Sequence, residues 1–288
     1  MKTDQMTSES IDSRNERLLS SEISSITKGK INNDPLISVI IPVFNEENTI
    51  KNVIERIPNH QEYEIIIVDD GSTDNSIKNV QELQERKVKI VKHTKNKGYG
   101  EAVLSGFRQA TGDIIVTLDS DGQHNPEEIP QLIKPIINNK ADMVIGSRYL
   151  GKCHYKMPLY VKVGEFFVQL CMRLLFLQRV YDNQCGFRAF KKEMEKIFSN
   201  MRYTDMGFST EMLFKTAFYK FKILEIPVSV NPRKYGTSYV NLIRITKSIS
   251  SCIIFYILRK FKLNINRFFL KKFVDYFYRR IKYKRIFQ

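Results

Sequence analysis

The feature that most constrains the fold is a regular alternation, between residues 36 and 230, of short β-branched runs and longer amphipathic stretches. The short runs are apolar on both faces, which is typical of parallel strands covered on both sides. The longer stretches carry apolar residues at three- and four-residue spacing and favour helices. The expected strands are 37–43, 64–68, 88–91, 114–118 and 143–145, and the expected helices are 48–57, 76–85, 100–110 and 126–137. This pattern predicts an α/β fold with a mostly parallel sheet.

Polar clusters follow three of the expected strands at the point where each strand ends. They are Phe44-Asn45-Glu46-Glu47, Asp69-Asp70-Gly71-Ser72 and Asp119-Ser120-Asp121-Gly122-Gln123-His124. Ligands of open α/β sheets bind beyond the carboxyl ends of the strands. We therefore expect the three acid-rich loops to converge on one site.

Asp119 and Asp121 stand two residues apart directly after an apolar strand. Extended geometry turns two such side chains to the same side, where they can share a hard divalent cation that completes its shell with phosphate oxygens. The pair predicts a Mg²⁺ or Mn²⁺ site for a diphosphate. The alternative is a simple turn, because Asp, Ser and Gly all favour turns.

Asp69 and Asp70 allow two interpretations as well. Either Asp-Gly forms a turn and Ser72 or Asp74 caps the next helix, or the adjacent carboxylates meet a cationic or hydrogen-bonding partner that offsets their repulsion. The segment 96–100, Asn-Lys-Gly-Tyr-Gly, resembles a phosphate-cradling loop at a helix start, although such glycines more often make a turn.

In combination, these motifs resemble glycosyltransferase family 2. The matching stretches are 41–46 (Ile-Pro-Val-Phe-Asn-Glu), 68–74 (Val-Asp-Asp-Gly-Ser-Thr-Asp), 96–106 and 119–126 (Asp-Ser-Asp-Gly-Gln-His-Asn-Pro). Four later motifs resemble the dolichyl-phosphate mannosyltransferase-like branch of polyprenyl-phosphate glycosyltransferases. These are 146–149 (Gly-Ser-Arg-Tyr), 182–188 (Asp-Asn-Gln-Cys-Gly-Phe-Arg), 207–211 (Gly-Phe-Ser-Thr-Glu) and 233–238 (Arg-Lys-Tyr-Gly-Thr-Ser).

The resemblance implies a GT-A fold, which is Rossmann-like, and an inverting, metal-dependent hexosyltransferase. Its donor would be a nucleotide sugar of the GDP-mannose or UDP-glucose type, and its acceptor a dolichyl or undecaprenyl phosphate. By similarity, the nucleoside pocket would be lined by Pro42, Phe44, Glu46, Val68 and Asp70, with Ser120 at the nucleotide. Asp119, Asp121 and Gln123 would hold Mg²⁺ or Mn²⁺ against the diphosphate.

Two arginines match family positions that contact donor or acceptor phosphates, namely Arg148 and Arg233. The forked guanidinium suits phosphate oxygens. This branch often has Lys after its Gly-x-Ser motif, where this chain has Tyr239. One phosphate contact is therefore absent or supplied by Lys234.

A lipid phosphate is already an anion near pH 7, so a dedicated catalytic base is optional. If the acceptor were instead a hydroxyl of a surface glycan, a base would be needed, and Glu211 is the candidate. Its alternative reading is an ordinary solvated acid on a helix. Arg188 is expected to be structural and to pair with a carboxylate beneath the acceptor site, and His124 to anchor its loop.

Basic residues are concentrated at the carboxyl-terminal end. The chain has 46 Lys and Arg against 31 Asp and Glu, yet residues 233–288 hold 15 of the basic residues and a single acid, Asp275. From Phe261 onwards, aromatic and aliphatic residues recur at helical spacing among these charges, as in helices that lie in a bilayer interface. Nucleic-acid binding is the rival interpretation, and we disfavour it because no RNA or DNA motif accompanies the charge.

We divide the chain into a polar, disordered segment 1–34, a catalytic domain 35–238 and a basic amphipathic tail 239–288. The longest apolar run, 252–258, is far shorter than the roughly 20 residues of a bilayer span. We read no secretory signal, and the four cysteines show no metal-site spacing. The expected enzyme is peripheral on the cytoplasmic face of an anionic membrane.

Overall fold

The computed structural model describes residues 35–59, 63–83, 87–155, 157, 159–205, 207–235 and 242–261. All of them belong to one compact unit that begins at Pro35. The predicted disordered segment 1–34 and the tail beyond residue 261 lie outside the described residues.

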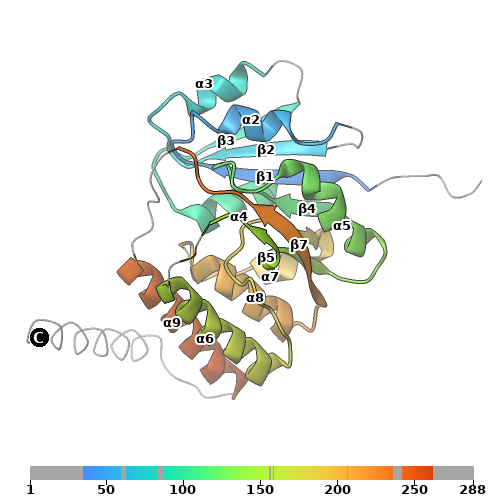
Figure 1. Cartoon of the computed structure of the whole chain (residues 1–288), viewed down its shortest axis with the longest axis vertical. Helices are drawn as coiled ribbons and strands as arrows, with labels where there is room; N and C mark the ends of the chain where they lie inside the picture. The colour runs from blue at the N-terminus through green and yellow to red at the C-terminus, as the bar shows by residue number, and fades with distance from the viewer. Residues whose placement is uncertain are drawn as a thin grey trace, which may run out of the picture. The chain divides into compact units, whose positions relative to one another are not determined.

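A seven-stranded sheet runs through the molecule in the order β3-β2-β1-β4-β6-β5-β7 (Figure 1). Six strands run parallel to one another, and β6 is antiparallel to both of its neighbours. The strands are β1 (Ile37–Val43), β2 (Tyr63–Asp69), β3 (Val88–Lys92), β4 (Ile114–Thr117), β5 (Met143–Cys153), β6 (Arg188–Lys191) and β7 (Ile223–Val230). The mostly parallel α/β architecture predicted from the sequence is confirmed.

The five predicted strands are present, and the sequence pattern missed β6 and β7. β5 is also longer than predicted, because its second half pairs with β7 after an irregularity between Ser147 and Lys152. The four predicted helices are confirmed as α2 (Ile50–Glu55), α3 (Ser76–Gln81), α4 (Tyr99–Gln109) and α5 (Ile129–Ile137), the last preceded by the 3₁₀ turn η1 (Pro126–Glu128).

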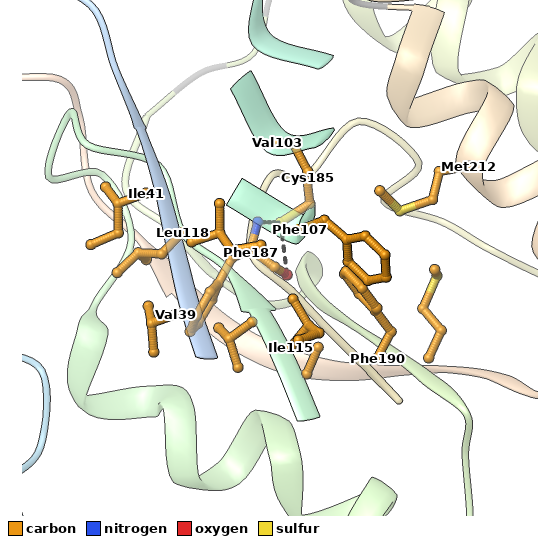
Figure 2. Close-up of a cluster of buried hydrophobic side chains, with 14 of the residues drawn as sticks. Val39, Ile41, Val103, Phe107, Ile115, Leu118, Cys185, Phe187, Phe190 and Met212 are labelled. Carbon is orange, nitrogen blue, oxygen red and sulfur yellow. Dashed lines mark hydrogen bonds between the residues drawn. The ribbon is translucent and has the colours of Figure 1, made fainter. Parts of the chain in front are cut away.

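The central strands lie in the hydrophobic core because other elements of the fold cover both of their faces. Every residue of β1 is buried. Helix α4 packs on β1 and β2, and α5 packs on β4, β5 and β6. Figure 2 shows one part of this core, where β-branched strand residues meet aromatic side chains from other elements. The labelled side chains are Val39, Ile41, Val103, Phe107, Ile115, Leu118, Cys185, Phe187, Phe190 and Met212.

A second group of helices follows the antiparallel strand. It comprises η2 (Lys192–Met194), α7 (Glu195–Phe198) and α8 (Gly207–Phe218), which packs against α6 (Leu159–Phe176) and α9 (Leu242–Lys260). Figure 1 shows α6 and α9 side by side next to α8. Within the described ranges, no helix is both long and apolar enough to cross a bilayer.

The contact between α4 and β1 depends on Gly106, because a Cβ there would overlap Cγ2 of Ile40. Gly106→Ala should lower the free energy of unfolding by about 1–3 kcal/mol, because the helix must move off the strand. Gly164→Ala is the matched control: nothing lies within 4 Å of a Cβ at Gly164, so alanine in that helix should be neutral or stabilising. Urea denaturation of both variants measures the difference, and equal stabilities would contradict the packing argument.

Candidate active site

Hydrogen bonds join the loops that follow β1 and β4 into one wall. Ser120 Oγ donates to the Pro42 carbonyl oxygen at 2.8 Å. Thr49 Oγ1 lies 2.8 Å from the Ser120 carbonyl oxygen and 3.2 Å from Glu46 Oε2. The structure therefore brings Pro42, Glu46 and Ser120 together at the carboxyl ends of the strands, as predicted.

Asp121 and Gln123 are held by the backbone of their own loop and of the segment after β7. The Gln123 backbone N–H donates to Asp121 Oδ1 at 3.0 Å. The Gln123 side-chain amide donates to the Asn231 carbonyl oxygen at 3.0 Å, and the Asn231 N–H donates to the Gln123 carbonyl oxygen at 2.8 Å. Because the amide nitrogen of Gln123 is used, its amide oxygen is the atom that it can offer to a ligand.

The carboxylate of Asp119 lies against the backbone of Gly186. A Cβ on Gly186 would overlap both oxygen atoms of this carboxylate. The Asp119 side chain keeps 31% of its accessible surface, so a cation can reach it. Burial raises the pKa of Asp119 to about 7, and the neighbouring Asp121 carboxylate acts in the same direction. Burial also raises the pKa of Asp121, although the Gln123 N–H and Arg233 oppose the shift.

These donors fit a hard divalent cation. Two neighbouring carboxylates with raised pKa values gain from a shared positive charge, and an amide oxygen suits the same ion. In the part of the chain that the structure describes, no three His, Cys, Asp or Glu side chains gather as a metal site. Two carboxylates leave room for phosphate oxygens, which is how Mg²⁺ is commonly held.

Arg233 bridges two of the predicted site residues. It pairs with Glu46, and its guanidinium lies 3.6 Å from Asp121 Oδ2. Burial raises the pKa of Glu46, while Arg233 lowers it and Asp121 raises it further. The segment after β7 thus places the guanidinium of Arg233 beside one carboxylate from the loop after β1 and one from the loop after β4.

Arg148 reaches the same edge from β5. Its Nη2 contacts Glu165 Oε1 at 2.7 Å and Asp182 Oδ1 at 3.0 Å, and its Nη1 donates to the Tyr155 hydroxyl at 3.2 Å. Its Nε is buried without a hydrogen-bond partner. Burial disfavours its charge, yet Asp182 and Glu165 raise the pKa of Arg148 above its usual range. This cation also stabilises the charged form of Asp119.

His124 is buried in its loop, and the anchoring role expected for it stays a prediction. Its Nε2 lies 3.8 Å from Asp119 Oδ2, and its ring centroid lies 5.3 Å from that of Phe187, with the two rings tilted by 39°. Burial, together with Arg148, lowers the pKa of His124 to about 4. The ring is therefore neutral at pH 7.

Asp70 organises the glycine loop that the sequence singled out. Its Oδ1 accepts the Lys97 N–H at 2.8 Å and contacts His93 Nδ1 at 2.7 Å, and its Oδ2 accepts the Gly98 N–H at 2.8 Å. The hydrogen-bonding interpretation of this acid is therefore correct. Both oxygens serve the protein, so the nucleoside contact predicted for Asp70 remains a prediction.

Val68 differs from its predicted place. It is fully buried, and its side chain faces Gly106 of α4. It lies beneath the candidate site because alternate residues of a strand point to opposite faces. Phe44, in contrast, is half-buried at the edge of the sheet.

Glu211 is not brought to the other site residues. It is fully buried in α8, where it accepts the N–H groups of Arg202 and Tyr203 at 2.8 and 3.0 Å and the Tyr256 hydroxyl at 3.2 Å. Neither the solvated acid nor the catalytic base expected from the sequence fits these contacts. The carboxylate fastens a loop and α9 to α8.

Arg188 is structural, as expected, but its partners differ from the expected carboxylate. Its guanidinium donates to three backbone carbonyl oxygens, those of Cys185, Asn183 and Ser209, rather than to a carboxylate. Burial lowers the pKa of Arg188. Its hydrogen bonds hold the segment 183–186, whose Gly186 contacts Asp119.

The sequence reasoning missed Thr49, His93 and Glu165 as partners of site residues. Each contacts a predicted site residue from a different element, so spacing within one motif carries no sign of it. Glu165 offered the one usable signal, because it is the sole acid in an otherwise apolar and basic helix.

Comparison with known proteins agrees with this geometry. A family model described as Glycosyl transferase family 2 matches residues 38–198. A UDP-N-acetylglucosamine–dolichyl-phosphate N-acetylglucosaminyltransferase of Methanococcus voltae is 39% identical over 222 residues, covering 70% of this chain and 88% of that protein. A dolichol-phosphate mannosyltransferase of Pyrococcus furiosus is 36% identical, and the match spans 70% of this chain and 58% of that longer relative.

Among solved structures, the glucosyl-3-phosphoglycerate synthase of Mycobacterium tuberculosis, in complex with Mn²⁺, UDP and phosphoglyceric acid, superposes with a TM-score of 0.62. The identity is 20%, and the match covers 81% of each chain. The mixed sheet with its acidic carboxyl edge is thus a GT-A fold. Together with the family match, this shows that the chain belongs to glycosyltransferase family 2.

The contacts of Glu211 predict a stability role. Glu211→Gln should lower the free energy of unfolding by about 1–3 kcal/mol, because an amide cannot satisfy the same buried donors. At a temperature where the variant is folded, its turnover should match the wild type. Glu195→Gln, an exposed acid on α7, is the control. Loss of turnover with unchanged stability would restore Glu211 as a base.

The raised pKa of Asp119 predicts a pH-dependent stability of the metal-free protein. Its pKa is about 7 in the folded chain and about 3.9 when unfolded. The protonated carboxyl of Asp119 therefore adds to the free energy of unfolding. This contribution is fully present below about pH 4 and is lost as pH rises through about 7. With a chelator present, Asp119→Asn should raise Tm at pH 8 by on the order of a few degrees and change it less at pH 5.

The exposed acid Asp113, just before the same strand, supplies the control. Asp113→Asn should shift Tm by a similar amount at both pH values. An Asp119→Asn shift that does not depend on pH would contradict the raised pKa.

Proposed function

We propose that this glycosyltransferase moves a hexose from a nucleotide sugar to a polyprenyl phosphate. The observation that carries the proposal is that two arginines serve the Asp119 and Asp121 carboxylates at one edge of the sheet: Arg233 lies 3.6 Å from Asp121 Oδ2, and Arg148 favours the charged form of Asp119. Such a site suits two phosphorylated reactants. The relatives from M. voltae and P. furiosus bear names that specify dolichyl or dolichol phosphate, which supports the same acceptor class here.

Asp119, Asp121 and Gln123 would hold Mg²⁺ or Mn²⁺. When bound, the cation supplies Lewis-acid stabilisation of the leaving diphosphate. Arg233 already sits beside Asp121 and Glu46 and can turn its guanidinium to a phosphate oxygen. Arg148 is held charged by two carboxylates and keeps an unpaired Nε–H.

The burial of Glu211 favours a phosphate over a hydroxyl acceptor. A sugar hydroxyl needs a positioned base, and the candidate for that role faces the interior. A lipid phosphate is already ionised and can attack the anomeric carbon directly, which inverts its configuration. Transfer to a glycan hydroxyl therefore stays the second proposal, and nucleic-acid binding a distant third.

For the donor, we propose GDP-mannose or UDP-glucose, and the name of the M. voltae relative adds UDP-N-acetylglucosamine to the candidates. For the location, we propose a peripheral position on the cytoplasmic face of an anionic membrane, to which the basic residues of 239–288 contribute. Each basic residue near an anionic leaflet adds about 1 kcal/mol.

The test is transfer by the purified full-length chain from a panel of radiolabelled GDP- and UDP-sugars to undecaprenyl and dolichyl phosphate with Mn²⁺ or Mg²⁺. We expect an organic-extractable labelled product with one donor. Asp121→Ala should lower turnover at least about a hundredfold, because transition-state charge loses its stabilisation.

Asp142→Ala is the control, since this acid pairs with Lys191 away from the site. No extractable product with any donor would refute the proposed acceptor. Full activity of Asp121→Ala would refute the metal assignment alone.

A further inference from the structure

The outward face of α6 is apolar along its whole length. Seven of the fifteen large apolar side chains that are exposed in the described part of the chain lie on this helix or directly after it, with exposed fractions between 38% and 90%. They recur at three- and four-residue spacing and form one stripe. The stripe consists of Leu159, Val163, Phe166, Phe167, Leu170, Leu174 and Leu177.

Packing within the fold does not account for this stripe. The opposite face of α6 packs against the rest of the domain through Val168 and Met172, which are fully buried. An 18-residue helix is about 27 Å long, so the stripe is a sizeable continuous patch. Soluble monomers rarely expose such a patch unless it binds a partner.

The exposed charges that the structure describes on α6 and on its neighbour α9 are all positive. Lys162 and Arg173 are exposed on the same helix, and its single acid, Glu165, faces inward with 2% of its side chain exposed. Helix α9, which packs beside α6, contains no acid and ends in Arg259 and Lys260. The partner must therefore accept apolar side chains and carry negative charge.

Two other occupants conflict with that charge. A second copy docked about a two-fold axis would set the same face against itself and bring Lys162 and Arg173 of both copies together. The segment 262–288 of the same chain holds nine basic residues and one acid, so covering the stripe with it would also crowd like charges. An anionic lipid surface satisfies both requirements.

We propose that the outer face of α6, flanked by the basic end of α9, docks on an anionic bilayer. The apolar side chains enter the interface between head groups and acyl chains, and the lysine and arginine side chains reach the lipid phosphates. The docking surface does not include the segment 262–288 of the basic tail.

The inner face of the same helix reaches the active site. Glu165 Oε1 lies 2.7 Å from Arg148 Nη2, and Asn183 Nδ2 donates to the Glu165 carbonyl oxygen at 3.0 Å. Because a helix with its side chains is about 10 Å across, docking would hold Arg148 roughly one helix diameter from the head groups. This link to catalysis rests on the proposed lipid-phosphate acceptor, whereas docking itself does not.

The test is co-sedimentation of the full-length chain with vesicles of phosphatidylglycerol and phosphatidylcholine in equal parts, without donor or polyprenyl phosphate. The double variant Phe166→Gln/Phe167→Gln should bind about tenfold or more weakly. The matched control, Ile137→Gln/Leu224→Gln, removes two exposed apolar side chains from α5 and β7 and should bind like the wild type. Circular dichroism and Tm establish that both variants are folded.

A charge variant, Lys162→Gln/Arg173→Gln, should weaken binding to these vesicles and lose that effect at high salt. Wild-type protein that does not bind, or folded Phe166→Gln/Phe167→Gln that binds normally while Lys271→Gln/Lys272→Gln does not, would overturn the proposal. So would a lipid-free dimer that Phe166→Gln/Phe167→Gln converts to a monomer in light scattering. Because the assay contains no substrate, failure of the proposed transfer reaction leaves its outcome unaffected.

Discussion

Two carboxylates that lie close together and partly buried cannot both stay charged without a compensating cation. Asp119 and Asp121 are in this position, and burial shifts the pKa of both upward. Much of the surrounding structure supplies partial compensation. Arg233 reaches Asp121 from the segment after β7, and Arg148 acts on Asp119 from the middle of β5. The edge is thus prepared for additional positive charge.

The same constraint connects parts of the chain that are distant in sequence. Gln123 is bonded through its backbone and side chain to Asn231, and Arg233 lies two residues further along. A cation that binds Asp121 competes with Arg233 for the same oxygen atoms. The position of the segment after β7 would then depend on whether the proposed metal site is occupied, and Arg233, once released from the carboxylate, would lie next to the incoming phosphate.

The sequence was informative where one short segment carries the whole signal. The local sequence pattern is enough to predict the buried parallel strands, the acid pair Asp119 and Asp121, and the turn at Ser120. β6 was not predicted because it has only four residues and begins with a buried arginine, a pattern that is not typical of a strand. Glu211 was misread because its partners, Arg202, Tyr203 and Tyr256, come from two other elements. Burial of Val68 beneath the site likewise depends on which face of β2 meets α4.

Helix α6 shows why the catalytic edge and a lipid surface can be served by one element. Its inward acid, Glu165, stabilises an arginine of the site, and its outward side chains are apolar and basic. A single interfacial signal gives only reversible membrane attachment, whereas two signals act together. An apolar stripe on the folded domain combined with a basic tail would supply two. The stripe lies on the helix whose Glu165 contacts Arg148, so docking through the stripe would fix how the site faces the bilayer.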